Sequence, residues 1–191
     1  MKKNIESKIV LFCVSLAIAA CGCSQESGST TDGSSAGSMT ETQAKPAAIA
    51  KLKPTQGNKV EGTVTFYEAA KGLRVVAHIT GLTPGEHGFH VHEHGDCSAP
   101  DASSAGGHFN PTSVPHGAPG AEQHHIGDLG NVNADAEGHV HLDKVFPFLT
   151  VAGENSIVGR GLIVHAGRDD LTSQPTGDAG GRVACGVIEK Q

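Results

Sequence analysis

The chain has 191 residues, of which 37% are hydrophobic and 18% charged, with no tryptophan; these values predict one domain with a modest core and additional segments. The formal net charge of −6 argues against nucleic acid as a partner, because that function needs a basic face. The 26 glycines favour β structure with many turns over a helical bundle, and 12 histidines on an acidic chain are a first indication of a metal site.

The first residues have the pattern of an export signal. A basic start precedes an apolar run over residues 9–20, which is far shorter than the roughly 20 residues that a membrane-spanning helix needs. Such a run is typical of a secretory signal peptide. It ends in Ile18-Ala19-Ala20-Cys21, which resembles the bacterial lipobox; the alternative is a plain signal peptide with a cysteine near its cleavage site. The sequence therefore predicts a signal peptide over residues 1–20 and a membrane anchor through lipid on Cys21.

Residues 21–45 form the next segment, which is rich in serine, threonine and glycine and poor in apolar side chains. Such a segment cannot bury enough surface to offset its ordering entropy, so we expect a disordered tether. Gly22 stands after Cys21 in place of the aspartate that marks inner-membrane retention in enteric bacteria. The expected location is therefore a bacterial cell envelope, with the outer membrane or periplasm favoured over the inner membrane.

The positions of the cysteines are consistent with export of the chain. Cys13 would leave with the signal peptide, and Cys21 would carry lipid. Of the remaining three, the distant pair Cys97 and Cys185 is expected to form a disulfide in an oxidising compartment. Cys23 is left as an unpaired thiol without an assigned role.

Residues 46–191 are expected to form the folded domain, and their patterns are those of β-strands. Apolar and polar residues alternate with period two over residues 59–68 and again over residues 73–80, so both stretches predict half-buried strands. Further short apolar runs lie at residues 89–91, 139–145, 162–164 and 183–188. No stretch has a convincing helical period. We therefore predict an all-β fold, an antiparallel β-sandwich or flattened barrel.

The stretch between His94 and Asn131 has almost no strand character. A loop of this length inside a domain usually has a function of its own. This one contains four histidines, one cysteine and Asp128. A metal ion and a disulfide could order such a loop where an apolar core does not.

Two histidines stand two residues apart at His90 and His92. On a strand both imidazoles point to one face, while Phe89 and Val91 point to the other, into the core. Paired imidazoles suit copper, zinc or iron, and copper if the site is redox-active. Such a pair alone is weak evidence, because solvated or core histidines explain most of them.

The positions of other histidines distinguish a metal site from a pair of solvated or core histidines. His165 directly follows the apolar run at residues 162–164 and faces away from Leu162 and Val164, as a ligand leaving a strand should. A second pair of histidines two residues apart, His139 and His141, is interpreted as a solvent-exposed face, because nothing near it in the sequence completes a site.

The loop itself offers three imidazoles and one carboxylate. This is a full tetrahedral zinc set with no vacancy, which is typical of a structural zinc site. Its members are His108, His116, His125 and Asp128.

Taken together, four segments resemble the copper,zinc superoxide dismutase family, in order along residues 46–191. They are HGFHVHE at residues 87–93, GHFNP at 107–111, HIGDLGN at 125–131 and GRVACGV at 181–187. The resemblance implies a Greek-key β-sandwich with long metal-binding and active-site loops, an architecture for which the family is well known. It also implies an enzyme that converts superoxide to dioxygen and hydrogen peroxide and so protects the cell envelope from oxidative damage.

The resemblance assigns roles to particular residues, with one copper and one zinc per subunit as cofactors. The implied copper ligands are His90, His92, His108 and His165, and the implied zinc ligands are His108, His116, His125 and Asp128. His125 is preferred to His124 because it directly precedes the segment IGDLG. Asp169 would link a copper-side and a zinc-side histidine, and His87 would be structural.

Two residues would act on the substrate. Arg182 would orient the superoxide anion with its fixed charge, and His108 would carry a proton as it bridges the two metals. A disulfide between Cys97 and Cys185 would pin the metal loop to the strand next to Arg182.

The chain departs from many relatives in two places. No lysine lies between Asp170 and Arg182, where relatives use lysines to draw anions inward, so steering would depend on Arg182, the metals or residues such as Arg168. His94 stands where eukaryotic relatives have an aromatic residue at their dimer interface, which argues against that surface and leaves a homodimer without an assigned interface. The alternative functions are a non-catalytic copper- and zinc-binding envelope lipoprotein and a disulfide-pinned sandwich used for adhesion.

Overall fold

The computed structural model describes residues 44–191. The predicted signal peptide, the lipid site at Cys21 and nearly all of the tether at 21–45 lie outside the described residues. The strands are β1 (Ala48–Pro54), β2 (Glu61–Glu68), β3 (Leu73–Thr80), β4 (Gly85–His92), β5 (Asp128–Ala134), β6 (Val140–Phe146), β7 (Gly161–His165) and β8 (Arg182–Lys190), with one short 3₁₀ turn, η1 (Ser103–Ala105). Within residues 44–191, no helix has the length and apolar character required to cross a bilayer.

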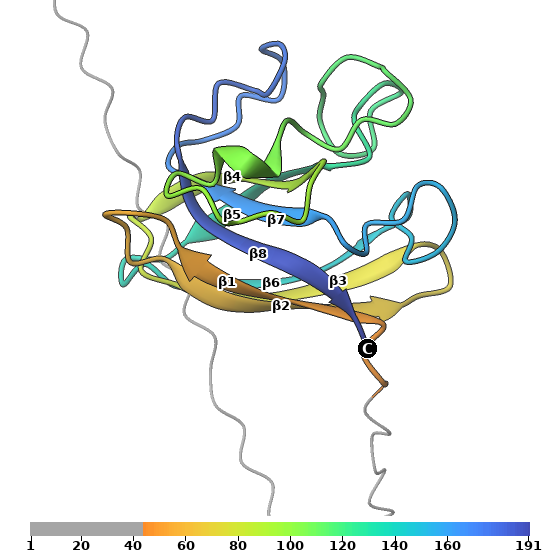
Figure 1. Cartoon of the computed structure of the whole chain (residues 1–191), viewed down its shortest axis with the longest axis horizontal. Helices are drawn as coiled ribbons and strands as arrows, with labels where there is room; N and C mark the ends of the chain where they lie inside the picture. Colours follow the sequence, from red (N-terminus) through yellow and green to blue (C-terminus); the bar gives the residue numbers. More distant parts are fainter. Residues whose placement is uncertain (1–43) are drawn as a thin grey trace, which may run out of the picture. The chain divides into compact units, whose positions relative to one another are not determined.

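All neighbouring strands are antiparallel, in the order β5-β4-β7-β8-β1-β2-β3-β6. Figure 1 shows β4, β5 and β7 in one layer and β1, β2, β3 and β6 in the other, with β8 passing between them. The edge strands β5 and β6 also contact each other, so the sheet forms a nearly closed barrel. The pairing of β3 with β6 and of β4 with β7 skips intervening strands, as in a Greek key. The all-β prediction is confirmed.

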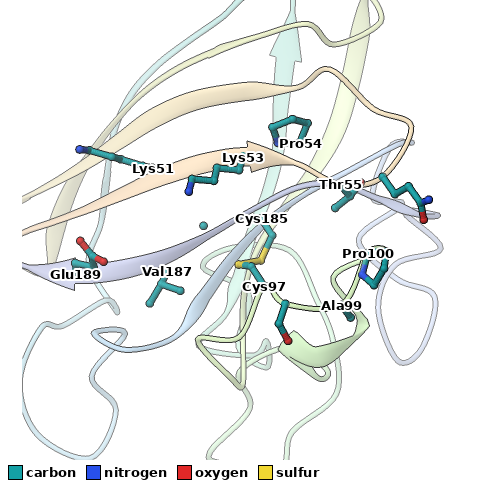
Figure 2. A pocket seen from close by; sticks show the side chains of 13 residues that line it. Lys51, Lys53, Pro54, Thr55, Cys97, Ala99, Pro100, Cys185, Val187 and Glu189 are labelled. Carbon is teal, nitrogen blue, oxygen red and sulfur yellow. A yellow bond between two sulfur atoms is a disulfide. The ribbon is translucent and has the colours of Figure 1, made fainter.

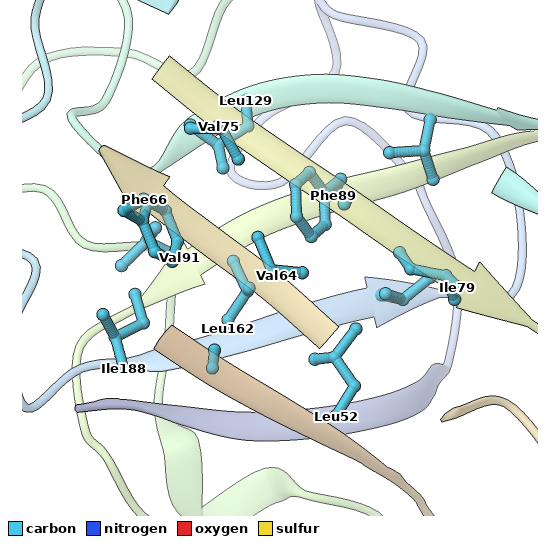
Figure 3. Close-up of a cluster of buried hydrophobic side chains, with 14 of the residues drawn as sticks. Leu52, Val64, Phe66, Val75, Ile79, Phe89, Val91, Leu129, Leu162 and Ile188 are labelled. Carbon is cyan, nitrogen blue, oxygen red and sulfur yellow. The ribbon is translucent and has the colours of Figure 1, made fainter. Parts of the chain in front are cut away.

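The core lies between the layers and follows the predicted alternation. Val64 and Phe66 of β2 are fully buried, as are Leu73 and Val75 of β3, whereas the residues between them face outward or are only partly buried. Figure 3 shows Val64 and Phe66 packed among Phe89, Leu129 and Leu162 from the opposite layer. Burial of each such side chain contributes about 1.5–3 kcal/mol, so this packing is the main support of the strands that hold the site.

Two strands were missed by the sequence analysis. In β1, the buried positions Ala48 and Ala50 have the apolar Ile49 between them, so the first half of the strand shows no alternation of apolar and polar residues. In β5, residues 128–131 were assigned to the loop, but they pair with β4 and bury Leu129. The prediction of a loop up to Asn131 was therefore wrong at its end, because pairing with β4 and not local periodicity decides where β5 begins.

Candidate metal centre

Strand β4 presents its two predicted histidines to one side. Phe89 and Val91 lie in the apolar core, so His90 and His92 point away from it, and both imidazoles are buried under the loops. His165 ends β7, where the pairing with β8 becomes irregular. Leu162 and Val164 face the core, as predicted, which turns His165 toward the β4 histidines.

Four buried imidazoles converge at this point. The four-histidine cluster consists of His90, His92, His108 and His165. Each offers one ligand atom, and these atoms lie within 4.8 Å of one another. The atoms that face the centre are His90 Nδ1, His92 Nε2, His108 Nε2 and His165 Nε2, and none has a hydrogen-bond partner among the described residues. A buried polar atom without a partner is costly, so a metal ion bound here would fit the donor set.

The opposite ring nitrogens fix the tautomers. His92 Nδ1 donates to the carbonyl oxygen of Gly106 at 3.0 Å, and His165 Nδ1 donates to that of Gly180 at 3.0 Å. A carbonyl oxygen only accepts, so the hydrogen is at Nδ1 and the lone pair of Nε2 faces the cluster. Burial lowers the pKa of His92 to about 2 and that of His165 to about 3, so both rings are neutral and able to bind a metal at neutral pH.

The loop residues form a second group around one carboxylate oxygen. This mixed cluster consists of His108, His116, His125 and Asp128. Asp128 Oδ1 lies 2.8 Å from His108 Nδ1, 3.0 Å from His116 Nδ1 and 3.2 Å from His125 Nδ1. Ligands about 2.0–2.1 Å from zinc at the corners of a tetrahedron are roughly 3.3 Å apart, so these spacings fit a four-coordinate zinc ion.

Asp128 is held in place by backbone donors. Its Oδ2 accepts hydrogen bonds from the backbone N–H of His125 at 2.8 Å and of Gly117 at 3.1 Å. Burial favours a higher pKa for Asp128, but the hydrogen bond with His108 and the close imidazoles of His116 and His125 outweigh burial and hold the pKa far below its usual range. The group is therefore a carboxylate at any physiological pH.

Asp169 connects the two clusters. Its Oδ2 accepts from His90 Nε2 at 2.8 Å and its Oδ1 accepts from His116 Nε2 at 3.0 Å. Asn131 holds the backbone of Asp169 with two hydrogen bonds, of 2.9 and 2.8 Å. Burial lowers the pKa of His116, but Asp128 and Asp169 outweigh burial and raise it to about 9, so this ring is protonated at neutral pH unless a metal ion replaces the proton.

A model of the family described as "Copper/zinc superoxide dismutase (SODC)" matches residues 60–188, which is well over half of the chain and includes every residue of both clusters. The chain belongs to the copper/zinc superoxide dismutase family. One relative is the protein named "Extracellular superoxide dismutase [Cu-Zn]" of Brugia pahangi, which is 46% identical over 150 residues, or 74% of each chain. The chain is therefore an enzyme of superoxide dismutation, with copper and zinc as the metals of its family.

Arg182 lies at the rim of the four-histidine cluster. Its Nη1 donates to the carbonyl oxygen of Ala102 at 2.5 Å and its Nη2 to that of Gly106 at 2.6 Å. Gly106 O also accepts from His92, so one carbonyl places both the guanidinium group and a histidine of the cluster. In a superoxide dismutase, a fixed positive charge beside the redox site can orient a small anion.

The predicted disulfide between Cys97 and Cys185 is confirmed, with a Cα–Cα distance of 5.8 Å. Cys185 follows Arg182 on β8, and Cys97 begins the loop segment whose carbonyls hold the guanidinium group. Ala102 and Ala105 of this segment pack on Ile163 and Cys185 in a small apolar cluster of their own. The disulfide thus fixes the loop that positions Arg182.

A hollow of about 580 Å³ is lined by residues of β1, β8 and the loop, with both cysteines of the disulfide among them. Figure 2 shows Cys97 and Cys185 in the middle of the lining residues, with Lys51, Lys53 and Glu189 to one side of them. No histidine lines it. It is therefore separate from both clusters and does not contribute to the metal centre.

The remaining predicted residues lie outside the clusters. The His87 ring nitrogens lie 2.9 Å from the carbonyl oxygen of His165 and 2.8 Å from that of Thr83, a position between backbone segments. His124 Nδ1 lies 2.7 Å from the carbonyl oxygen of His125, and its ring packs against Phe148.

Two residues near the centre were missed by the sequence analysis. Gln174 exchanges hydrogen bonds with the backbone of His116, of 2.8 and 2.9 Å. Gly177 has φ of +71°, and a Cβ there would overlap Asp169 Oδ1 and lie 2.7 Å from His116 Nε2, so only glycine fits. Nothing in the sequence separates Gly177 from the other glycines, because its role depends on a contact between distant loops.

Proposed function

We propose that copper binds at the four-histidine cluster, that zinc binds at the mixed cluster, and that His108 bridges the two. The observation that carries this proposal is the set of four buried imidazole nitrogens that face one point without a hydrogen-bond partner. Their opposite nitrogens bond to carbonyl or carboxylate oxygens, the pattern that orients metal-bound histidines.

The chain's own residues provide binding and proton placement. When bound, copper supplies the one-electron exchange by which one superoxide is oxidised to dioxygen and a second, with two protons, is reduced to hydrogen peroxide. Arg182 would hold the anion beside the cluster through its fixed charge. His108 can carry a proton at Nε2, which has no hydrogen-bond partner, while Nδ1 stays with Asp128. Asp169 keeps His90 and His116 in orientation.

The test is superoxide decay measured on the copper- and zinc-loaded chain. We expect a rate constant near the diffusion limit of about 10⁸–10⁹ M⁻¹ s⁻¹, which superoxide dismutases are known to approach. His90→Ala should remove nearly all activity together with bound copper, and His94→Ala, at an exposed histidine outside both clusters, serves as the matched control. Arg182→Ala should retain copper but lose roughly tenfold or more in rate. An unaltered rate in His90→Ala would show that copper is bound elsewhere.

The alternative of a non-catalytic metal-binding lipoprotein is not favoured. A metal buffer has no use for a guanidinium group fixed by two carbonyls beside a ligand histidine.

We also propose that residues 1–20 are a signal peptide, that 21–45 are a lipidated tether starting at Cys21, and that 46–191 are the catalytic domain in a bacterial cell envelope. The lipobox-like order before Cys21 supports this. The Cys97–Cys185 disulfide supports export, because disulfides persist in oxidising compartments. The name "extracellular" of the relative from Brugia pahangi agrees with a location outside the cytoplasm.

Lipid attachment is tested by labelling the expressed full-length chain with a radioactive fatty acid. We expect label in the membrane fraction, its loss in Cys21→Ser, and its retention in the control Cys23→Ser. Label that persists in Cys21→Ser would contradict the anchor.

A homodimer remains part of the proposal, and its mass can be measured by light scattering of the purified chain. His94 is exposed, and the family resemblance aligns it with an aromatic residue at the dimer interface of eukaryotic relatives. We expect His94→Ala to leave the measured mass unchanged, whereas conversion of a dimer to a monomer would place the interface at His94.

A further inference from the structure

Two further histidines face each other on the outside of the molecule. His78 of β3 and His141 of β6 are directly paired across the antiparallel strands, and both are exposed. Their Nδ1 atoms lie 2.9 Å apart, and their rings meet edge to face with centroids 4.9 Å apart. Nothing near His141 in the sequence indicates a partner, because its partner is 63 residues away along the chain.

The spacing of the two Nδ1 atoms suits one metal ion. Two imidazole nitrogens bound to one ion at about 2.0–2.1 Å in neighbouring coordination positions are roughly 3 Å apart. In the metal-free pair one ring donates Nδ1–H and the other accepts it. An ion that binds both rings at Nδ1 therefore requires the donor ring to take the Nε2–H tautomer, its proton moving from Nδ1 to Nε2 by exchange with solvent. Little backbone change is required, because the pairing of β3 with β6 already brings the rings together.

The surroundings provide room and further donors. The two histidines line a surface hollow of about 540 Å³ together with His139 and Glu61. His139 is two residues before His141, the spacing that places side chains on the same face of an extended strand. Glu61 pairs with Thr80, so it is diagonal to His78, at about 7–8 Å between such positions.

Lys51, a lysine that lines the hollow, does not lie directly beside the histidine pair. Lys51 pairs with Thr63, which pairs with His78, so Lys51 is two strands away from the imidazole. At about 4.8 Å per strand this is roughly 10 Å, near the screening length at physiological ionic strength. Lys53 also lines the hollow, and the carboxylate of Glu61 offsets part of this charge.

The pair is separate from the catalytic metals. No member of the four-histidine cluster or the mixed cluster lines the hollow. The pair lies on the outer face of the layer formed by β1, β2, β3 and β6, whereas Ala77, Ile79 and Val140 on the intervening positions face the core.

We propose that His78 and His141 form a surface site for one divalent transition-metal ion of the class that prefers imidazole, namely Cu²⁺, Ni²⁺ or Zn²⁺. Water, Glu61 or His139 completes the coordination. Affinity follows the usual order for nitrogen ligands, with Cu²⁺ tightest and Ni²⁺ and Zn²⁺ weaker.

The test begins with full-length chain that has been shown by metal analysis to hold one copper and one zinc. A titration with Ni²⁺, monitored by calorimetry, should show that each chain binds one further ion without releasing copper or zinc. His78→Asn and His141→Asn should each weaken this binding at least tenfold, and the exposed His94→Asn, which removes one unpaired surface imidazole, should not change it. Thermal unfolding of each variant verifies that it is folded.

Two results would overturn the proposal. One is absence of a further Ni²⁺ ion on the loaded chain. The other is full retention of Ni²⁺ binding in the His78→Asn/His141→Asn double variant, with loss in Cys23→Ser, which would place the ion on the N-terminal thiol. Since copper and zinc are already bound before the titration and superoxide decay is measured separately, neither result bears on the catalytic site.

Discussion

The two halves of the metal centre are built by different means. The four-histidine cluster takes three of its members from β4 and β7, whose intervening residues Phe89, Val91 and Leu162 lie in the main apolar core. The mixed cluster takes its members from the segment between His108 and Asp128, which has almost no strand pairing of its own before β5. It is held by Asp128, Asp169 and Gln174 through polar contacts.

This difference indicates that the order of the two clusters depends on bound metal to different degrees. Strands that are packed into a core keep their histidines in place when the metal is absent. A loop held by polar contacts around a buried carboxylate loses much of its order when the charges there are not balanced. The copper side should therefore behave as a preformed site and the zinc side as part of the fold's stability.

The largest expected effect is that of Asp128→Asn. This change removes the charge around which three imidazoles gather, and breaking such a buried arrangement costs about 3–5 kcal/mol. We expect a large fall in Tm and a loss of zinc affinity of at least about 100-fold, measured by chelator competition. His92→Asn on the strand side is the matched comparison and should reduce copper binding with a smaller fall in Tm. Equal falls in Tm would contradict the difference between the halves.

Asp169→Asn should weaken the connection between the halves. An amide has one acceptor oxygen, so it cannot accept from both His90 and His116 as the carboxylate does. We expect a loss of roughly 10–100-fold in metal affinity with the fold intact, since partners of metal-bound histidines have effects of this size. Asp178→Asn, an exposed change of the same type in the same loop, is the control. Equal metal affinity in the two variants would show that Asp169 does not contribute to metal binding.

The stability of the metal-free chain should depend on pH in opposite ways for the two halves. His92, His108 and His165 have pKa values lowered to about 2, 4 and 3, chiefly by burial. As pH falls below about 6.5 the unfolded chain takes up protons at these rings and the folded chain does not, so stability falls toward pH 4.

His116 acts in the other direction. With its pKa raised to about 9, it keeps its proton in the folded chain where the unfolded chain has lost it, so stability falls as pH rises from about 6.5 to 9. The Tm of metal-free protein should therefore be highest near pH 6.5 and fall on both sides. In His116→Asn the fall on the basic side should disappear. A Tm that rises steadily from pH 6.5 to 4 would contradict the lowered values.

The smallest expected effect is that of salt on the rate. Arg168, one of the few cations near the site, is paired with Glu86 at 2.7 Å, so little of its charge is free to steer superoxide. The negative charge of Asp178 further weakens the attraction of superoxide to this region. We expect the rate constant to change by less than about threefold between low and physiological ionic strength. A steep fall with added salt would indicate a steering field from other residues.

Much of this site can be predicted from the sequence because local patterns specify local directions. Period-two alternation determined which faces of β2 and β3 are buried, and the spacing of His90 and His92 determined that both point away from the core. The loop histidines and Asp128 could be predicted as a zinc set because zinc binds imidazole and carboxylate donors, but the choice of His125 over His124 depended on the segment IGDLG that follows it.

Only the tertiary structure decided which distant groups meet. The bridge through Asp169, the carbonyl of Gly106 shared by His92 and Arg182, the glycine required at Gly177 and the pairing of His78 with His141 all join segments far apart in the chain. Periodicity reports the environment of a residue along its own strand, whereas these contacts depend on strand order and loop path, which many sequences with the same local pattern would not share.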